Sequence, residues 1–402
     1  MADQRKREND SVPALRFEGF SDPWEQRRLG ELYKPVYEKN DLSFETDKII
    51  SVAAMRFNPE AVVSDREYLR TYNVMRVGDI AFEGHSNKEF SHGRFVENVI
   101  GDGIVSHIFI VFRPNTSYDL WYWKYAINNE RLMRSALVRS TKASTMMHDL
   151  VANDFLSESI PVPSLPEQHK IGALFAKLDS LITLHQRKVD KLKTVKQSLL
   201  EKMFPREGEN VPEIRFEGFT DPWEQRRLGE LFVESEDRSS DLEILSVSVA
   251  NGIYPASDSD REINPGASLV NYKVVRKGDV VYNSMRMWQG AVDSSLHDGI
   301  VSPAYVVARP VSMTASRFFA RLLKRPNLLC QYQRRSQGNS KDTQVLKFEE
   351  FAEIEVSVPL FRKEQEAIGS LADALDSLIT LHQRELEILK NLKQACLEKM
   401  FV

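Results

Sequence analysis

The sequence of 402 residues contains two segments that each occur twice, and this duplication limits what the chain can fold into. The first segment, RFEGFSDPWEQRRLGEL at residues 16–32, returns with one substitution at residues 215–231. The second, LDSLITLHQR, occurs without change at residues 178–187 and 375–384. Identity over such lengths indicates a tandem duplication, so we expect the two halves to share one fold.

The repeats also predict the order of domains. Each half has about 150 residues of mixed pattern, followed by about 37 residues without proline that resemble a helix. The polar start of the chain predicts a tail and not a secretory signal. The predicted boundaries are a tail at 1–14, a first mixed domain at 15–165, a central helix at 166–206, a second mixed domain at 207–361 and a C-terminal helix at 362–402.

The two proline-free stretches have apolar residues at steps of three and four, which is typical of a coiled-coil seam. The stripes match between the copies, so each helix is the nearest candidate partner of the other. Two separate helices that each lie on their own domain remain the alternative. We interpret His185 and His382 as packed polar residues, because no set of metal ligands surrounds them. The main predicted seam positions are Leu174, Leu178, Leu181, His185, Leu192, Leu371, Leu375, Leu378, His382 and Leu389.

The domains before these helices show a mixed α/β pattern, and the predicted fold class is therefore α+β. Helices are expected at residues 120–138 and 315–334. Strands are expected at residues 48–54, 79–82, 104–112, 243–249, 279–282 and 301–308.

The sequence lacks the motifs of common enzyme classes, so we predict no catalytic activity. It contains no GxxxxGK[ST], GxGxxG or HExxH motif, no acidic residue two positions before a lysine, and no Asn-Pro-Pro-Tyr or Asp-Pro-Pro-Tyr loop. Two cysteines cannot form a disulfide framework or a four-thiolate zinc site, and no metal site is predicted. Without a run of 18 apolar residues we expect no membrane span, and the chain is expected in the cytoplasm.

The net charge of −4 does not exclude local basic surfaces that bind DNA phosphates. Residues 317–347 contain eight basic residues and one acidic residue, and residues 121–148 show a weaker form of the same bias. Arginine, lysine, asparagine and glutamine are the side chains that read base edges. The candidate DNA-binding residues are His85, Asn87, Lys88, Arg94, Arg139, Lys142, Asn283, Arg286, Trp288, Gln289, Arg334, Arg335 and Lys341.

The candidate loops differ between the halves, whereas the repeated segments barely differ. Residues 283–289 read NSMRMWQ, and their counterpart at residues 83–94 has an unrelated sequence. A retained scaffold with changed loops is what we expect of a protein that reads two different targets. For each single basic residue the alternative remains open that its side chain is simply solvated and does not bind DNA.

The order of the repeats, the RFEGF and DPWEQRRLGEL openings, and the segment PEQHKIGALFAKLDSLITLHQR together resemble the specificity subunits of type I restriction-modification systems. The segment GDVVYNSMRMWQGAVDSSLHDGIVSPAY, at residues 278–305, also resembles the family's target-recognition domain. The resemblance covers nearly the whole chain. The first half departs from it at residues 86–94, which lack an Arg-x-Trp-x-Gly pattern.

The resemblance implies a non-catalytic subunit with two target-recognition domains, each of which binds one half of a split double-stranded DNA site. It also implies that the two helices form an antiparallel coiled coil, related by a pseudo-two-fold axis, that sets the spacing and docks methyltransferase subunits. Such packing would bring Phe401 near the Arg16 segment. The implied partners are two modification subunits that use S-adenosylmethionine, and restriction subunits that use ATP and Mg²⁺; no cofactor is expected on this chain.

Two other functions remain open at this point. The first is a coiled-coil adaptor whose mixed domains bind proteins and not DNA, and it predicts no retention on DNA at physiological salt. The second is a self-sufficient nuclease or methyltransferase, which the absence of motifs disfavours.

Overall fold

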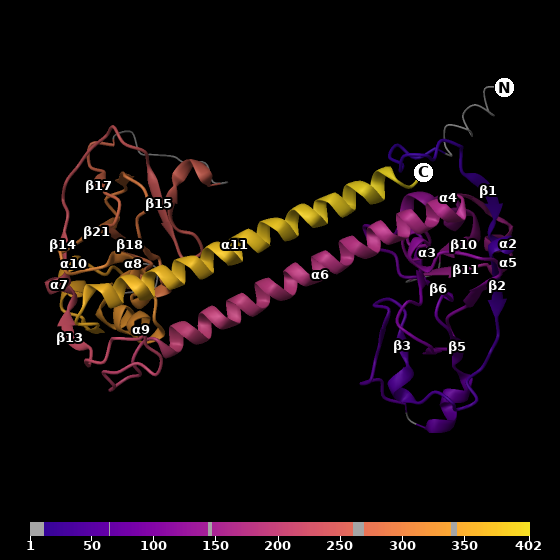
Figure 1. Ribbon diagram of the computed structural model, residues 1–402, viewed down its shortest axis with the longest axis horizontal. Helices are drawn as coiled ribbons and strands as arrows, with labels where there is room; N and C mark the ends of the chain where they lie inside the picture. Colours follow the sequence, from indigo (N-terminus) through magenta and orange to yellow (C-terminus); the bar gives the residue numbers. More distant parts are fainter. Residues whose placement is uncertain (1–11, 64, 144–146, 260–268, 339–343) are drawn as a thin grey trace. The chain divides into compact units, whose positions relative to one another are not determined.

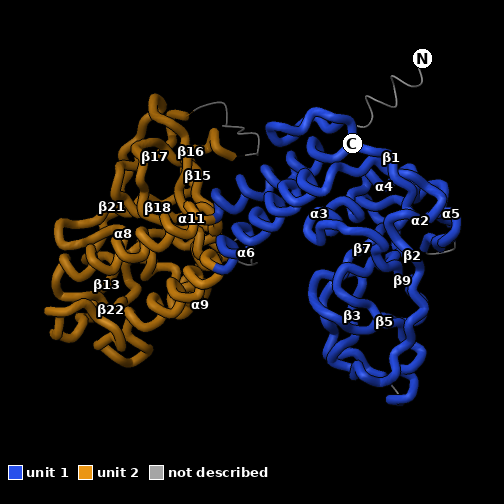
Figure 2. The backbone as a smooth tube through the Cα atoms, turned by 45° about the vertical axis from the view of Figure 1, so that its right-hand side comes forward, with its two compact units in different colours: residues 1–187, 383–402 blue, residues 188–382 orange. Residues whose placement is uncertain are grey.

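The computed structural model describes residues 12–63, 65–143, 147–259, 269–338 and 344–402 (Figure 1). The chain divides into two compact units (Figure 2). Unit 1 comprises residues 1–187 and 383–402, and unit 2 comprises residues 188–382. Each unit therefore contains one mixed domain together with parts of both long helices.

Unit 1 is built on a four-stranded antiparallel sheet in the order β2-β9-β6-β7. These strands are β2 (Tyr33–Val36), β9 (Val111–Pro114), β6 (Ile80–Glu83) and β7 (Arg94–Glu97). The two-stranded sheets pair β1 (Glu25–Arg28) with β12 (Ser159–Val162), β3 (Ile50–Ser51) with β4 (Arg56–Phe57), β5 (Asn73–Met75) with β8 (Gly103–Val105), and β10 (Thr141–Ala143) with β11 (His148–Leu150). The helices of the mixed domain are α2 (Leu29–Leu32), α3 (Leu120–Ala126), α4 (Glu130–Ser140) and α5 (Ala152–Ser157), with short 3-10 turns η1 (Thr46–Lys48) and η2 (Arg66–Thr71).

Unit 2 repeats this architecture, with the sheet order β14-β21-β18-β19. These strands are β14 (Phe232–Glu234), β21 (Tyr305–Pro310), β18 (Val280–Asn283) and β19 (Val292–Ser294). The two-stranded sheets pair β13 (Glu224–Arg227) with β22 (Glu355–Val358), β15 (Leu245–Ser248) with β16 (Gly252–Pro255), and β17 (Lys273–Val275) with β20 (Gly299–Val301). The helices are α7 (Leu228–Leu231), α8 (Ser316–Leu322), α9 (Pro326–Arg335) and α10 (Phe348–Ala352), with 3-10 turns η3 (Ala256–Asp258) and η4 (Met287–Gln289).

The two long helices predicted from the repeats are α6 (Leu165–Lys202) and α11 (Arg362–Lys399), each of 38 residues. In unit 1 the two helices run antiparallel, because Asp179 binds Lys393 at 2.7 Å and His185 binds Glu385 at 3.0 Å. In unit 2 Lys196 forms the equivalent ion pair with Asp376.

The end of each long helix completes the core of a unit. In unit 1 the backbone nitrogen of Leu15 donates to the carbonyl oxygen of Lys399 at 2.9 Å, and the Phe401 ring packs on Trp24. This confirms that Phe401 lies near the Arg16 segment. In unit 2 Phe204 makes the same kind of contact with Trp223.

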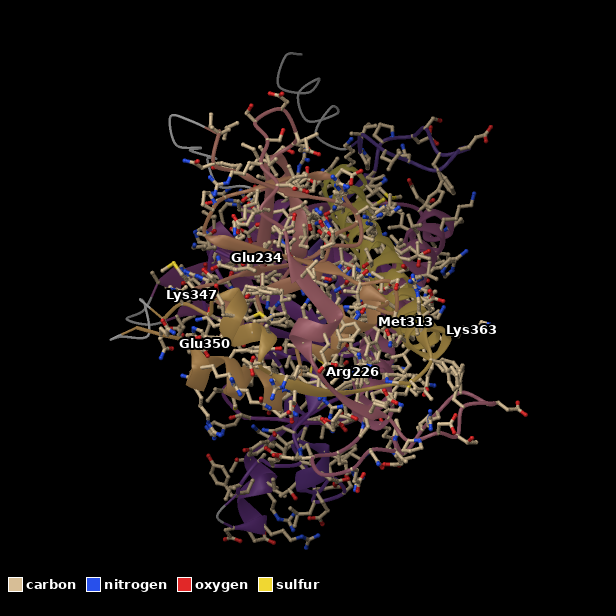
Figure 3. The ribbon with its side chains drawn as sticks, turned by 90° about the vertical axis from the view of Figure 1, so that its left-hand side faces the viewer. Arg226, Glu234, Met313, Lys347, Glu350 and Lys363 are labelled. Carbon is tan, nitrogen blue, oxygen red and sulfur yellow. The ribbon has the colours of Figure 1, made fainter. Side chains whose placement is uncertain are left out.

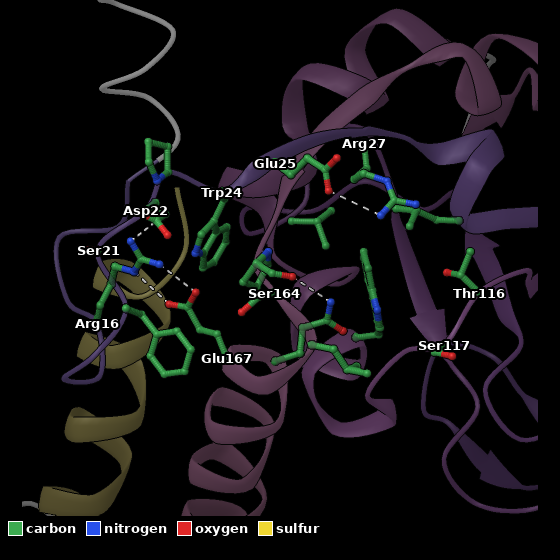
Figure 4. A pocket seen from close by; sticks show the side chains of 18 of the residues that line it. Arg16, Ser21, Asp22, Trp24, Glu25, Arg27, Thr116, Ser117, Ser164 and Glu167 are labelled. Carbon is green, nitrogen blue, oxygen red and sulfur yellow. Dashed lines mark hydrogen bonds and ion pairs between the residues drawn. The ribbon is translucent and has the colours of Figure 1, made fainter.

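A buried ion pair fastens each repeated opening segment to the first turn of a long helix. The Arg16 guanidinium donates to both carboxylate oxygens of Glu167 at 2.9 and 2.8 Å (Figure 4). Arg215 binds Glu364 in unit 2 with nearly the same distances, 2.9 and 2.7 Å. Both glutamates are only 1% exposed, so these pairs position the mixed domains on the helices largely shielded from solvent.

Some predicted elements are shorter than expected. The helix expected at 120–138 is divided into α3 and α4, because the Asn129 side chain caps the backbone nitrogen of Leu132. The helix expected at 315–334 ends before Pro326, which begins α9. The strands expected at 104–112 and 301–308 are each divided by a turn, so their apolar runs belong to two sheets.

The predicted seam follows the buried side of the long helices at most positions but not at Leu378. Leu178 is buried, and Leu174 and Leu389 pack against the core of unit 1. Leu371 packs against the core of unit 2. The other predicted positions Leu181, His185, Leu192, Leu375 and His382 are half-buried. Leu378 is 44% exposed and its neighbour Ile379 is buried, which corrects the prediction at this position. An α-helix has 3.6 residues per turn, so apolar positions that repeat every 3.5 residues on average rotate gradually around the helix and away from its buried side.

Candidate nucleic-acid interface

In both units an Arg–Asp ion pair holds the turn before the strand that leads into the candidate DNA-binding loop. In unit 1 the Arg113 guanidinium binds the buried Asp79 at 2.9 Å through two nitrogens, and this hydrogen bonding raises the pKa of Arg113. In unit 2 Arg309 binds Asp279 at 3.3 and 3.4 Å. Each aspartate immediately precedes the central strand that leads into the loop, so the pair fixes where that loop leaves the sheet.

In unit 2 the β18–β19 loop, residues 284–291, packs against α9 through η4. Met287 is buried in the core, and Gly290 adopts a positive φ of 90° that closes the turn. Arg286 and Gln289 are exposed on this loop, whereas Trp288 is half-buried and packs against the core. Asn283, at the end of β18, accepts a hydrogen bond from the Met285 backbone nitrogen at 3.0 Å.

The basic end of α9 lies beside the β18–β19 loop. Arg334 and Arg335 are exposed in the last turn of α9. The chain then returns through Leu346, whose backbone nitrogen donates to the Ser284 carbonyl oxygen at 2.9 Å. Glu350, which follows at the edge of unit 2 seen in Figure 3, accepts a hydrogen bond from Gln337. Two predicted segments that are 50 residues apart therefore form one surface; Lys341 lies outside the described residues.

Unit 1 builds its β6–β7 loop, residues 84–93, in the same place on the sheet. The backbone nitrogen of His148 donates to the Gly84 carbonyl oxygen at 2.8 Å, as Leu346 does to Ser284 in unit 2. Asn87 shapes the loop, since its Oδ1 atom accepts hydrogen bonds from two backbone nitrogens at 2.8 and 2.9 Å. His85 and Lys88 are exposed, and His85 Nδ1 lies 2.5 Å from the buried Glu83.

Three further candidates of unit 1 lie around this loop, and two of them are already bound within the unit. Arg94 donates to the Ala53 carbonyl oxygen at 2.7 Å. Arg139 binds Glu158 at 2.8 Å, and this hydrogen bond raises the pKa of Arg139. Lys142 is exposed on β10. Of these three, Lys142 presents its charge to solvent without such a bond in the described residues.

One protein family matches the first half of the chain. Residues 21–194 match the family model described as Type I restriction modification DNA specificity domain. This match covers the first mixed domain and most of α6, so this part of the chain resembles a specificity domain of that family. The match supports a role in DNA sequence recognition within a type I restriction-modification system.

Solved structures of specificity subunits resemble the chain over nearly its whole length. The type I restriction-modification S subunit from M. genitalium aligns with a TM-score of 0.58 and 12% identity, covering 97% of this chain and 99% of that one. The HsdS subunit from Thermoanaerobacter tengcongensis gives a TM-score of 0.46 and 19% identity, covering 96% and 98%. A comparison with curated proteins finds no match. The M. genitalium structure supports the fold of the specificity subunit for both units.

The sequence suggested that His92 could share a surface with His85, but it did not indicate that His148 lies against His92. His92 of the β6–β7 loop lies against His148 of β11, with ring centroids 5.2 Å apart. The Ser91 hydroxyl contacts His92 Nδ1 at 2.8 Å and donates to Glu130 at 3.1 Å. No local sequence pattern predicts this cluster, because the pairing of β11 with the β6–β7 loop brings its members together.

Neither a metal site within one unit nor a helix that could cross a membrane accompanies these loops in the described residues. In the described residues of either unit taken by itself, no three His, Cys, Asp or Glu side chains converge as ligands for a metal. Among the described helices, none is long and apolar enough to cross a membrane. The exposed basic and polar side chains of the two loops remain the features that suit DNA.

Proposed function

We propose that each unit of this specificity protein reads one half of a split DNA site through the major groove. The observation that carries the proposal is that the two units present different side chains from the same place on their equivalent sheets. Unit 2 exposes Arg286 and Gln289, whereas unit 1 exposes His85 and Lys88. Arginine pairs well with guanine and glutamine with adenine, so the two loops are suited to different bases.

The same proposal assigns the long helices the role of a spacer. The mixed domains at 15–165 and 207–361 are the target-recognition domains, and the helices at 166–206 and 362–402 form an antiparallel coiled coil with a pseudo-two-fold axis. The repeated ion pairs Asp179–Lys393 and Lys196–Asp376 support this arrangement, since each unit uses the same pair of helix positions. Two-fold related readers suit half-sites about one helical turn, roughly 34–36 Å, apart.

The chemistry is assigned to partner subunits and not to this chain. Two modification subunits with S-adenosylmethionine would dock on the helices and methylate adenine, and restriction subunits with ATP and Mg²⁺ would join this complex in the cytoplasm. The lack of nucleotide-binding, metalloprotease, nuclease and methyltransferase motifs in the sequence supports a non-catalytic role.

Co-expression of the chain with its modification subunits, followed by mapping of methylated adenines across the host genome, tests the proposal. We expect methylation in a two-part motif with a constant gap. A stable complex that gives no new methylation would contradict the proposal and favour the adaptor.

Two matched variants assign each half of the motif to a unit. We expect Arg286→Ala to change one half-site and His85→Ala to change the other, because each side chain belongs to a different loop. A tenfold loss corresponds to about 1.4 kcal/mol, within the range of a single base contact. Equal weakening of both half-sites by either variant would show a general phosphate contact or a structural role.

A further inference from the structure

The β6–β7 loop of unit 1 and the β18–β19 loop of unit 2 end with the same kind of turn. Gly93 and Gly290 are both buried and adopt positive φ values of 77° and 90°. The strands on either side of the two loops pair in matching registers. When the loops are aligned on these strands and glycines, His92 occupies the position of Gln289, which is exposed. His92 is therefore the residue of unit 1 that stands where unit 2 places a candidate base-reading side chain.

Two consecutive hydrogen bonds hold the ring of His92. The Ser91 hydroxyl donates to the carboxylate of Glu130, the first residue of α4, at 3.1 Å. The same hydroxyl oxygen lies 2.8 Å from His92 Nδ1. A serine hydroxyl has one hydrogen and a carboxylate can only accept, so the hydrogen of the second contact belongs to the imidazole ring. His92 Nδ1 therefore carries a proton and donates to the Ser91 oxygen.

The other nitrogen of this ring, Nε2, is accessible to solvent. It has no hydrogen-bond partner in the described residues, and it is not one of the unpaired polar atoms that are buried. The ring itself has little freedom to turn, because His148 of β11 lies against it with ring centroids 5.2 Å apart. A ring that is held at Nδ1 and packed against a neighbour presents Nε2 in a fixed direction, as a specific contact requires.

The protonated nitrogen decides which bases the ring can read. In a neutral imidazole with its proton on Nδ1, Nε2 carries a lone pair and accepts a hydrogen bond. The donors of the major groove are the amino groups of adenine and cytosine, whereas guanine and thymine present only acceptors there. The neutral His92 ring in this tautomer therefore suits adenine or cytosine on the strand that it contacts, and it disfavours guanine or thymine.

We propose that His92 reads the amino group of an adenine or cytosine in the half-site of unit 1, and that Ser91 and Glu130 select the tautomer which makes this contact possible. Ser91 and Glu130 are positioning residues, since they act through the ring and not on the base. The inference rests on the proposed function, because it adds one base contact to a loop that is already assigned to DNA.

Unit 2 has no equivalent of these two hydrogen bonds. Trp288 and Pro326 stand at the positions of Ser91 and Glu130, because the loops end alike and α4 and α9 begin at equivalent positions. The side-chain amide of Gln289 has a donor and an acceptor that do not exchange, so it needs no selection of a tautomer. The positioning pair is thus present in the unit whose side chain at this place is a histidine.

NMR of the full chain without DNA measures the tautomer directly. Spectra of protein labelled with ¹⁵N-histidine, recorded at about pH 8 where neutral imidazole generally predominates, distinguish a proton on Nδ1 from one on Nε2, and His92→Gln assigns the signals. We expect the Nδ1 proton on His92 in the parent and a loss of this preference in Ser91→Ala. Ser86→Ala makes the same change at an exposed serine of the same loop and should leave the tautomer unchanged. A proton on Nε2 in the parent, or an unchanged tautomer in Ser91→Ala, would overturn the proposal.

Methylation mapping of the co-expressed complex tests the base contact. We expect His92→Ala and Ser91→Ala to reduce discrimination about tenfold at the same single position of one half-site, and to admit there an exchange between an amino base and a keto base. The other half-site should stay as it was, which shows that the variant proteins fold. His107→Ala, at an exposed histidine of unit 1 outside the loop, should leave both half-sites unchanged.

The possible failures of this inference and of the proposed function are distinct. A two-part motif that His92→Ala leaves intact, or that His107→Ala changes in the same way, would overturn the inference and leave the proposed function standing. A parent complex that methylates no two-part motif would overturn the proposed function and the base contact together.

Discussion

At the scale of single residues, the two units place different chemistry on equivalent backbone positions. Tyr33 and Glu97 of unit 1 are buried polar residues, and both carry atoms without a hydrogen-bond partner in the described residues. The corresponding residues of unit 2 are Phe232 and Ser294, neither of which is acidic. Unit 1 therefore contains a buried acid at a position where unit 2 has a serine, and Glu97 adds to the pH dependence of its stability a contribution that this position of unit 2 cannot make.

We predict that raising the pH destabilises unit 1 through Glu97. Burial raises the pKa of Glu97 in the folded state above its ordinary value of 4.5, so the folded state holds a proton that the unfolded state has lost. The free energy of unfolding then falls as the pH rises above this ordinary value. Hydrogen exchange of unit 1 should become faster in the parent than in Glu97→Gln as the pH increases, after correction for intrinsic rates. Exchange of unit 2 serves as the internal control, and an equal response of both proteins in unit 1 would contradict the prediction.

At the scale of elements, strong periodicity predicted the long helices correctly, whereas the turns that divide shorter apolar runs were not predicted. The long helices were predictable because two matched stripes extend over many turns without proline. The divisions between α3 and α4 and between β8 and β9 depend on a cap and a turn, which an uninterrupted apolar run does not reveal. The strands that lead into the candidate loops were predictable, and the role of the loops in binding DNA stays a prediction. The contact of His148 with the β6–β7 loop depends on tertiary pairing.

The contact between each long helix and the helix packed against it provides a prediction at this scale. A Cβ atom added at Gly172 of α6 would clash with Asp119 Oδ1 and lie 2.7 Å from the Tyr122 backbone nitrogen. At Gly369 of α11 the nearest atom is the Phe318 backbone nitrogen, at 3.0 Å. Overpacking costs about 1–3 kcal/mol, while alanine gains about 1 kcal/mol over glycine within a helix.

We therefore expect Gly172→Ala to destabilise the protein by about 1–2 kcal/mol, and Gly369→Ala to be nearly neutral. Urea unfolding of the two variants measures the difference, and each serves as the control for the other. A larger loss in Gly369→Ala than in Gly172→Ala would show that the closer backbone approach is not what limits the packing.

At the scale of the whole molecule, the proposed function makes the length of the helices a determinant of the DNA gap. An α-helix rises 1.5 Å per residue, so four residues added within 188–197 lengthen α6 by about 6 Å. This corresponds to about two base pairs of B-DNA at 3.4 Å each. The same addition within 385–394 of α11, at the equivalent repeat positions, lengthens the second helix by the same amount.

We predict that the doubly extended protein methylates a motif with the same two halves and a longer gap. The loops proposed to read the bases are unchanged, because the insertions lie outside both mixed domains. Methylation mapping of the co-expressed complex measures the gap directly. Four residues inserted instead after Gly208, in an exposed turn beyond the end of α6, lengthen the chain without lengthening a helix and should leave the gap as it was. If both insertions gave the original gap, the helices would not set the spacing; if the half-sites themselves changed, the helices would take part in reading the bases and not only in holding the readers apart.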